Sequence, residues 1–301
     1  MTNGSYQNRI DRVVDYIQAN LESDLSVGQL SEVACFSEFH FSRIFREQMG
    51  EPVYQFIRRL RLEKAAELLL SNTSLPVTDV ALMCGFATPS SFAKSFKAHF
   101  KMNATEWRQR ADTSFGGRAF PFEPNHFSIE NNSPVWTFEE TGRQVKIEEI
   151  PSLKVGYVRY VGQYQGDEEI FTCLYKRLFQ WALPRGYVAD DTVTLNLYHD
   201  NPEITESGKL RVMVAVPIPD SVETSDTVGI TTLSGGTYAT CRFSLKKDGF
   251  VAAWKWMFAV WLKESGYELD DRELFERYLC RKIMDGDSIF EVDICVPVKA
   301  K

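Results

Sequence analysis

The chain has 301 residues, of which 44% are hydrophobic and 25% charged, as expected for a globular protein of about two domains. No run of about 18 apolar residues occurs, so the sequence predicts no membrane contact, and its start lacks the pattern of an export signal. The six cysteines are scattered and form no CxxC pair. This favours a cytoplasmic protein and argues against a metal site or a disulfide framework.

The net charge of −7 is unevenly distributed along the chain. Residues 1–110 carry 13 Lys and Arg against 12 Asp and Glu, a balance of +1, and the remaining residues carry 21 against 29, a balance of −8. The acidic excess therefore belongs to the C-terminal part. Because charges are screened beyond about 8–10 Å, local basic clusters in the N-terminal part are sufficient for contact with phosphates.

Apolar periodicity predicts seven helices in the N-terminal part, several with clear start and stop signals. Ser37 and Thr88 are natural N-caps, Pro89 suits a first helical position, and Gly50 and Gly85 suit turns. The predicted helices are Ile10–Leu21, Val27–Cys35, Glu38–Met49, Val53–Leu70, Val77–Cys84, Pro89–Phe100 and Thr105–Arg110.

Two pairs of these helices have the form of a helix-turn-helix. In the second pair Phe92, Phe96 and Phe100 form an apolar stripe and lysines lie on the opposite face. Leu25–Phe36 aligns with Leu75–Phe86, so the first pair is a matched copy. Helical hairpins of a repeat protein are the alternative, but such proteins usually need three or more copies. The duplication favours DNA binding.

The segments RRLRLEKAAELLL, ALMCGFATPSSFAKSFKAHF and ATEWRQR together resemble the DNA-binding domain of AraC/XylS transcription regulators. The resemblance implies an all-α domain, residues 1–111, in which one long helix joins two helix-turn-helix units that enter successive major grooves. Some positions depart from the family pattern. The family usually has Gly at the position that Lys101 occupies here, and often has Gly at the position of Cys35. Departures also occur at Ser31, Asn103 and Ala104.

Eight residues on the second helix of each pair, or just after it, are expected to contact DNA. Contacts to base edges are expected from Arg43 and Lys94, helped by Phe39, Ser42 and Ser90. Contacts to phosphates are expected from Arg46, Lys97 and Lys101. Because Arg43 belongs to the first unit, we expect that unit to supply more of the sequence specificity.

Residues 112–142 are rich in Pro, Gly and Asn and are interpreted as a linker with little regular structure. From residue 143 to 301 the pattern changes to short strands and two longer helices, which favours an α+β domain of two ββαββ repeats with sheets that face each other across a ligand cleft. The predicted helices are Glu168–Pro184 and Phe250–Ser265. The predicted strands are Gln144–Ile150, Lys154–Val161, Thr192–Tyr198, Lys209–Val216, Val228–Leu233, Thr237–Phe243, Arg272–Arg281 and Ile289–Val298.

One carboxylate in the predicted strand Arg272–Arg281 is a candidate ligand anchor. Strict alternation places Glu276 on the same face as Leu274 and Tyr278, where a buried carboxylate is costly unless it meets a cation or hydrogen-bond donors. The alternative is a solvent-exposed face on which Glu276 pairs with a nearby Arg or Lys. Asp200 and Glu273 are weaker candidates and fit turn and surface positions better.

The segments YHDNP, KLRVMVAV, LSGGTYA, FERYL and DICVPV, in this order, resemble the GyrI-like (SOUL/SHS2-type) effector-binding domain. In that family the Glu of the F-E-x-Y segment lies at the base of an aromatic pocket that binds cationic, lipophilic molecules, and here it corresponds to Glu276. The resemblance implies that aromatic residues form the wall of this pocket. The candidates are Tyr157, Tyr198, Trp254, Trp256, Phe258 and Tyr278. The helical spacing of Trp254, Phe258 and Trp261 is, however, more often that of a plain core.

The sequence thus predicts a DNA-binding transcription regulator controlled by a small-molecule effector, with promoter DNA and RNA polymerase as partners. We expect no cofactor, no metal and no catalytic residue, since no HExxH, GxSxG or P-loop pattern occurs. Two alternatives stay open for the C-terminal domain. One is a small-molecule hydrolase that uses Glu276 as a base, and the other is a protein-binding module similar to topoisomerase inhibitors.

Overall fold

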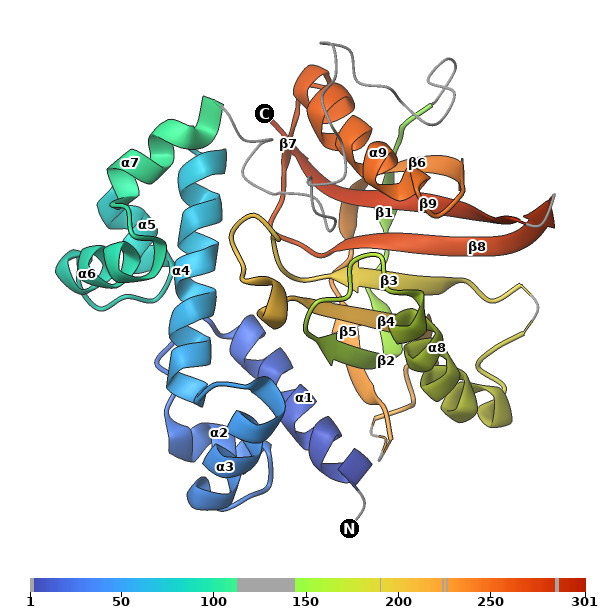
Figure 1. Ribbon diagram of the computed structural model, residues 1–301, viewed down its shortest axis with the longest axis horizontal. Helices are drawn as coiled ribbons and strands as arrows, with labels where there is room; N and C mark the ends of the chain where they lie inside the picture. Colours follow the sequence, from blue (N-terminus) through green and yellow to red (C-terminus); the bar gives the residue numbers. More distant parts are fainter. Residues whose placement is uncertain (1–2, 113–143, 190, 224, 226, 285–286) are drawn as a thin grey trace. The chain divides into compact units, whose positions relative to one another are not determined.

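The computed structural model describes residues 3–112, 144–189, 191–223, 225, 227–284 and 287–301. These residues form two compact units, one made of helices and one built on a sheet (Figure 1). Apart from Asp112, the predicted linker lies outside the described residues.

The N-terminal unit contains the helices expected from the sequence. The second helix of each predicted pair, Glu38–Met49 and Pro89–Phe100, has the predicted bounds. The helices are α1 (Asn3–Ala19), α2 (Val27–Val33), α3 (Glu38–Met49), α4 (Val53–Ser71), α5 (Val77–Met83), α6 (Pro89–Phe100) and α7 (Ala104–Arg108), followed by a 3₁₀ turn, η1 (Gln109–Asp112).

Helix α4 lies between the pair α2–α3 and the pair α5–α6 (Figure 1). The aromatic stripes of α3 and α6 face inward: Phe45 contacts Phe56 of α4 with ring centroids 5.4 Å apart, and Phe96 contacts Trp107 at 5.9 Å. The Trp107 indole donates a hydrogen bond to the Ala66 carbonyl of α4 at 3.1 Å. Burial of one stripe per helix leaves the opposite faces of α3 and α6 in solvent.

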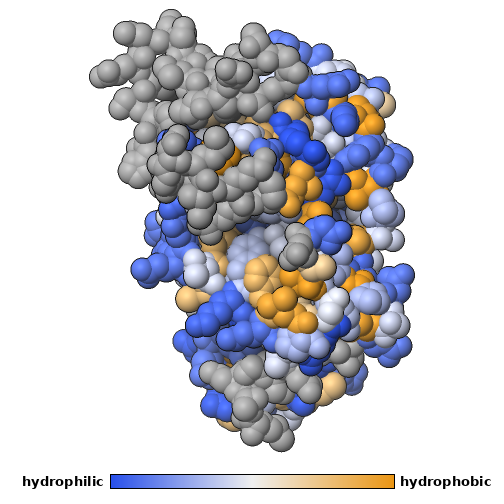
Figure 2. All heavy atoms as spheres, turned by 90° about the vertical axis from the view of Figure 1, so that its right-hand side faces the viewer, coloured by the Kyte–Doolittle hydropathy of each residue, from blue (hydrophilic) through white to orange (hydrophobic). Residues whose placement is uncertain are grey.

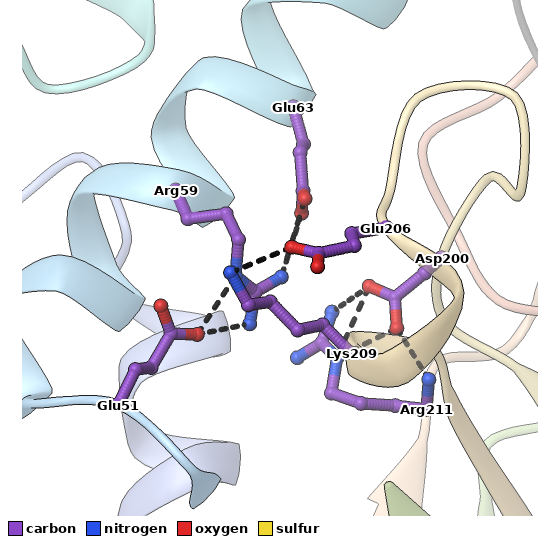
Figure 3. Close-up of polar contacts among 7 residues, drawn as sticks. All are labelled: Glu51, Arg59, Glu63, Asp200, Glu206, Lys209 and Arg211. Atoms are coloured by element: carbon purple, nitrogen blue, oxygen red, sulfur yellow. Dashed lines mark hydrogen bonds and ion pairs between the residues drawn. The ribbon is translucent and has the colours of Figure 1, made fainter. Parts of the chain in front are cut away.

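Two arginines of α4 connect it to other parts of the unit. Arg59 is buried between two carboxylates, with its Nη2 2.7 Å from Glu51 Oε1 and its Nη1 3.0 Å from Glu63 Oε2 (Figure 3). Arg61 donates from Nε to the Leu21 carbonyl at 2.9 Å. Gly85, in the turn before α6, has φ +77°, and a Cβ there would lie 2.8 Å from that same carbonyl oxygen, so the turn requires glycine.

The C-terminal unit contains one nine-stranded antiparallel sheet. The strands are β1 (Lys146–Ile150), β2 (Leu153–Val161), β3 (Thr194–Tyr198), β4 (Arg211–Pro217), β5 (Gly229–Leu233), β6 (Gly236–Leu245), β7 (Tyr267–Leu269), β8 (Leu274–Met284) and β9 (Asp287–Ala300). Their order is β1-β6-β9-β8-β3-β4-β2-β5, with β7 paired to β9.

The prediction of two facing sheets is wrong, because β3 and β8 pair directly and join all strands into one sheet. Outward from this central pair the order is β8, β9, β6, β1 on one side and β3, β4, β2, β5 on the other. The side made of β8, β9 and β6 thus ends in β1, from the first half of the domain, and the side made of β3, β4 and β2 ends in β5, from the second half. The prediction also missed β7, a three-residue strand too short to give a periodic signal.

Two helices accompany the sheet: α8 (Glu168–Ala182) and α9 (Gly249–Trp256), which continues as a π-helix, Met257–Leu262. Contacts from Tyr175 of α8 and Trp254 of α9 place both helices on one face of the sheet. The other face carries a hydrophobic cluster that includes Leu195 and Phe275. On the outer surface of this unit, hydrophobic side chains gather in patches between hydrophilic ones (Figure 2).

Candidate functional site

The outer faces of α3 and α6 carry seven of the eight residues that the sequence predicts to contact DNA, and the eighth, Lys101, follows directly as the C-cap of α6. Each of them is solvent-exposed: Phe39, Ser42, Arg43, Arg46, Ser90, Lys94, Lys97 and Lys101. Phe39 is the one apolar residue among these, and it is 83% exposed. The arrangement could serve contact with a polyanion, since four of the five basic residues lie on the two helices.

The starts of α3 and α6 are fixed by the predicted caps. Ser37 Oγ accepts a hydrogen bond from the His40 amide at 3.4 Å, and Thr88 Oγ1 accepts one from the Ser91 amide at 3.1 Å. The N-terminal residues of both helices are therefore held in place, next to the base-contact candidates Phe39 and Ser90.

In the C-terminal unit, Glu276 lies at the centre of the sheet on the face covered by α8 and α9. Its side chain is 0% exposed and accepts three short hydrogen bonds. Oε2 accepts from the hydroxyls of Tyr198 at 2.7 Å and Tyr278 at 2.8 Å, and Oε1 accepts from Trp254 Nε1 at 2.7 Å. All three donors are uncharged, and no arginine or lysine among the described residues donates to this carboxylate.

Burial raises the pKa of Glu276 above its ordinary value, and its three hydrogen-bond donors together with the nearby Asn196 side chain offset only part of this shift. Burial and the nearby Glu276 carboxylate raise the pKa of both tyrosines well above the usual range, so both remain protonated donors. A cation beside Glu276 would favour its ionised form. The site is therefore suited to attract positive charge.

A chain of hydrogen bonds reaches Glu276 from the neighbouring strand. Tyr175 of α8 donates to Asn196 Oδ1 at 2.6 Å, and Asn196 Nδ2 donates to the Tyr278 hydroxyl at 3.2 Å. Tyr278 in turn donates to Glu276. Because an ionised carboxylate only accepts, every hydroxyl in the chain is oriented toward it.

Aromatic rings surround this polar centre. Tyr198 contacts Trp254 edge to face and Tyr164 nearly parallel, both with centroids 6.1 Å apart, and Trp254 stacks on Phe258 at 5.9 Å. The buried Tyr164 hydroxyl has no hydrogen-bond partner among the residues that the structure describes. Aromatic faces next to a carboxylate are suited to a ring-bearing cation.

Not all predicted wall residues are brought to this centre. Tyr157 lies in the hydrophobic cluster on the opposite face of the sheet, and Trp256 contacts Phe243 of β6 edge to face at 6.1 Å. Asp200 forms a buried ion pair with Arg211, whose Nε lies 2.9 Å from Asp200 Oδ2 (Figure 3). Glu273 lies at the turn before β8 and is only partly buried.

Sequence reasoning missed Asn196, Tyr175 and Tyr164, which the structure adds to the centre. A signal for Asn196 does exist: β3 contains Asn196-Leu197-Tyr198 and β8 contains Glu276-Arg277-Tyr278, two copies of a polar residue followed by tyrosine two positions later.

Within the described part of the chain, no group of three or more His, Cys, Asp or Glu side chains could hold a metal ion. No described helix is both long and apolar enough to cross a membrane. The two candidate sites are the polar centre at Glu276 and the exposed faces of α3 and α6.

The helical unit with exposed basic helices and the sheet with a buried acid under two helices define a DNA-binding type of domain followed by a ligand-binding type. The chain belongs to the family of the GyrI-like small molecule binding domain, whose model matches residues 143–299. A helix-turn-helix domain model of the AraC type matches residues 30–110.

Several known proteins are similar to parts of the chain. An HTH-type transcriptional regulator of Staphylococcus aureus strain MRSA252 is 33% identical over 187 residues, which cover 55% of this chain and 25% of that protein. The probable transcriptional regulator LumQ of Photobacterium leiognathi is 34% identical over 94 residues, 31% of this chain and 38% of that one. The chain thus spans only about a quarter to two fifths of these relatives.

Among solved structures, an AraC-type transcriptional regulator from Chromobacterium violaceum is 27% identical. The match covers 36% of this chain and 96% of that one, with a TM-score of 0.34.

Proposed function

We propose that this chain is a sequence-specific transcription regulator whose C-terminal domain binds a small, lipophilic cation and thereby alters DNA binding or contact with RNA polymerase. The single observation that carries the effector assignment is Glu276, a fully buried carboxylate whose hydrogen-bond donors within the described part of the chain are all uncharged. Such a group is costly to ionise until a cation approaches. A lipophilic cation offers that charge together with ring surfaces that pack on aromatic side chains.

For the N-terminal domain we propose two helix-turn-helix units, α2–α3 and α5–α6, that enter successive major grooves from one side of the duplex. Arg43 and Lys94 contact base edges, while Arg46, Lys97 and Lys101 contact phosphates. The exposure of these side chains and the capped starts of both helices support this arrangement. Two units in one chain allow a monomer to occupy a complete site.

The effector assignment is tested by calorimetric titration of the full chain with tetraphenylphosphonium, which is permanently charged, and with triphenylphosphine oxide, which has aromatic rings but no net charge. We expect the cation to bind and Glu276→Gln to lose at least about thirtyfold in affinity, since removal of one member of a buried charge pair typically costs that much. Glu273→Gln removes the same charge three residues away and should bind as the native chain does.

Equal affinity of the native chain and Glu276→Gln for tetraphenylphosphonium would overturn the effector assignment. Turnover of a reactive ester that depends on Glu276 would instead favour a hydrolase. Capture of a protein partner that blocks dye binding would favour a protein-binding module.

The DNA assignment is tested with binding sites selected from a random oligonucleotide pool. Arg43→Ala should lose about 1–3 kcal/mol of discrimination at one half-site when single bases are changed. Lys97→Ala should weaken all sites equally and reduce the salt dependence of binding. Unchanged discrimination by the Arg43 variant would remove this residue from base contact.

A further inference from the structure

The two central strands of the sheet present matched side chains to the helices. Asn196 of β3 is the direct register partner of Glu276 of β8. Both are almost completely buried, at 3% and 0% exposure. Two positions further along each strand lies a tyrosine, Tyr198 or Tyr278, and both donate to Glu276.

The helices complete the match. Tyr175 of α8 donates to Asn196 at 2.6 Å, and Trp254 of α9 donates to Glu276 at 2.7 Å. Each half of the domain thus supplies one helix aromatic that donates to one buried polar residue of its own central strand. The positions of these side chains are thus related by a near two-fold symmetry, but only one of the two halves supplies a carboxylate, Glu276.

From this arrangement we propose that Asn196 is a second ligand-binding position, equivalent to Glu276, and that the bound cation lies over the register pair of the two residues. This inference rests on the proposed effector function. It assigns the site to the centre of the β3–β8 pair rather than to Glu276 alone. It also implies that one carboxylate, at either of the two positions, is sufficient for cation binding.

Hydrogen-bond geometry allows the charge to be exchanged between the two positions. Asp is isosteric with Asn, so the carboxylate introduced by Asn196→Asp would still accept from Tyr175. Tyr278, which lies 3.2 Å from Asn196 Nδ2, would rotate its hydroxyl and donate to the new carboxylate. The amide introduced by Glu276→Gln would still accept from Trp254 and could donate to a tyrosine oxygen. Trp254, Tyr175 and Tyr278 thus keep an acceptor in the exchanged protein, while the Tyr198 hydroxyl receives a hydrogen bond from the introduced amide instead of donating one to the carboxylate.

Electrostatics also favours the exchange. Directly opposed residues of antiparallel strands have Cα atoms about 4.5–5.5 Å apart. Because the Coulomb energy falls as the inverse of distance, even a charge moved from about 4 to about 7 Å from the cation would keep more than half of this energy. The exchanged site should therefore recover most of the affinity that Glu276→Gln loses.

The test is a titration of tetraphenylphosphonium into four full-length proteins: native, Glu276→Gln, Glu276→Gln/Asn196→Asp and Glu276→Gln/Asn201→Asp. The last is a matched control, because Asn201 is also buried and uses its side-chain oxygen as an acceptor, but lies outside the β3–β8 register pair. We expect Glu276→Gln to lose at least about thirtyfold and Asn196→Asp to restore affinity to within about tenfold of native. The control should restore none.

Circular dichroism and the urea midpoint of each protein establish that it is folded before affinity is compared. If native protein binds and Glu276→Gln does not, but a folded Glu276→Gln/Asn196→Asp protein fails to recover, the assignment of Asn196 is wrong and the effector function stands. If native protein itself binds no cation, the effector function fails. If Glu276→Gln/Asn196→Asp does not fold, the affinity of Asn196→Leu for the cation decides: an unchanged affinity contradicts the assignment.

Discussion

The sheet of the C-terminal unit buries two carboxylates on neighbouring strands in opposite environments. Glu276 of β8 lies on the face covered by helices and, among the residues that the structure describes, receives hydrogen bonds from uncharged donors only. Asp293 of β9 lies on the other face, flanked in register by Arg242 and Arg277, whose guanidinium groups donate to it at 2.8 Å and 2.9 Å. Both carboxylates are at most 3% exposed.

The consequences for their protonation are opposite. Burial raises the pKa of Glu276 and the neutral donors do not fully compensate. Burial alone would also raise the pKa of Asp293, but hydrogen bonds from Arg242 and Arg277 outweigh it and lower the pKa. The difference shows which carboxylate already has its cations. Asp293 is paired within the fold, whereas under the proposed function Glu276 receives a positive charge from outside the chain.

The largest expected effect is on the paired carboxylate. Asp293→Asn leaves two arginines facing a neutral side chain, so we expect the free energy of unfolding to fall by about 2 kcal/mol, less than for a fully buried pair because Arg242 is largely exposed. Urea denaturation at neutral pH measures this. Glu276→Gln should change the same quantity by less than about 1 kcal/mol. A larger loss at Glu276 than at Asp293 would reverse the comparison.

The pH dependence of stability should differ in sign between the two groups. The lowered pKa of Asp293 contributes stability above the ordinary aspartate pKa, and this contribution is lost as the pH falls through the folded value. The raised pKa of Glu276 gives a contribution to stability that is fully present below the ordinary glutamate pKa of about 4.3 and is lost as the pH rises through the folded value.

Relative to native protein, Glu276→Gln should therefore gain stability as the pH rises above about 4, by at most about 1.4 kcal/mol per pH unit. Asp293→Asn should lose less at acidic pH than at neutral pH. Urea midpoints of the three proteins between pH 4 and pH 8 give both slopes. Parallel curves for native protein and Glu276→Gln would mean that Glu276 titrates normally.

Much of the N-terminal fold was predictable because its signals are local. The bounds of α3 and α6 follow from a capping residue, a four-residue aromatic spacing and a turn after the last residue. Eight of the nine strands of the described sheet were predictable for the same reason. The single sheet was not, because β1 pairs with β6 and β5 with β2, and no local pattern records which distant strands pair.

The candidate site was also predictable only where local patterns within one strand determine it. Alternation placed Glu276 and Tyr278 on one face, and the structure brings Tyr198 and Trp254 to them. Alternation within β2 could not show on which face of the whole sheet Tyr157 lies, since that depends on the register through β4 and β3. The structure places Tyr157 on the face of the sheet that points away from Glu276.

Cation binding should follow the protonation of Glu276. A permanently charged ligand does not titrate, so its affinity should rise with pH, by up to about tenfold per unit below the pKa of Glu276, and level off above it. Titrations of tetraphenylphosphonium across pH 5 to 8 measure this dependence. Asp293→Asn should give the same profile, because that carboxylate lies on the other face of the sheet. A flat profile for native protein would indicate that Glu276 is already ionised in the absence of ligand.

The smallest expected effects separate two tyrosines near Glu276. Tyr198→Phe removes one donor to the carboxylate, so it should lower the free energy of unfolding by about 1 kcal/mol and shift the pH profile of cation binding upward, since the pKa of Glu276 rises further. Tyr164→Phe removes a buried hydroxyl that has no hydrogen-bond partner among the described residues, so it should raise the free energy of unfolding by up to about 1 kcal/mol. Urea denaturation and the cation titration of both variants, compared with native protein, give these signs. A loss of stability in Tyr164→Phe equal to that in Tyr198→Phe would mean that the Tyr164 hydroxyl also contributes a hydrogen bond to the polar centre.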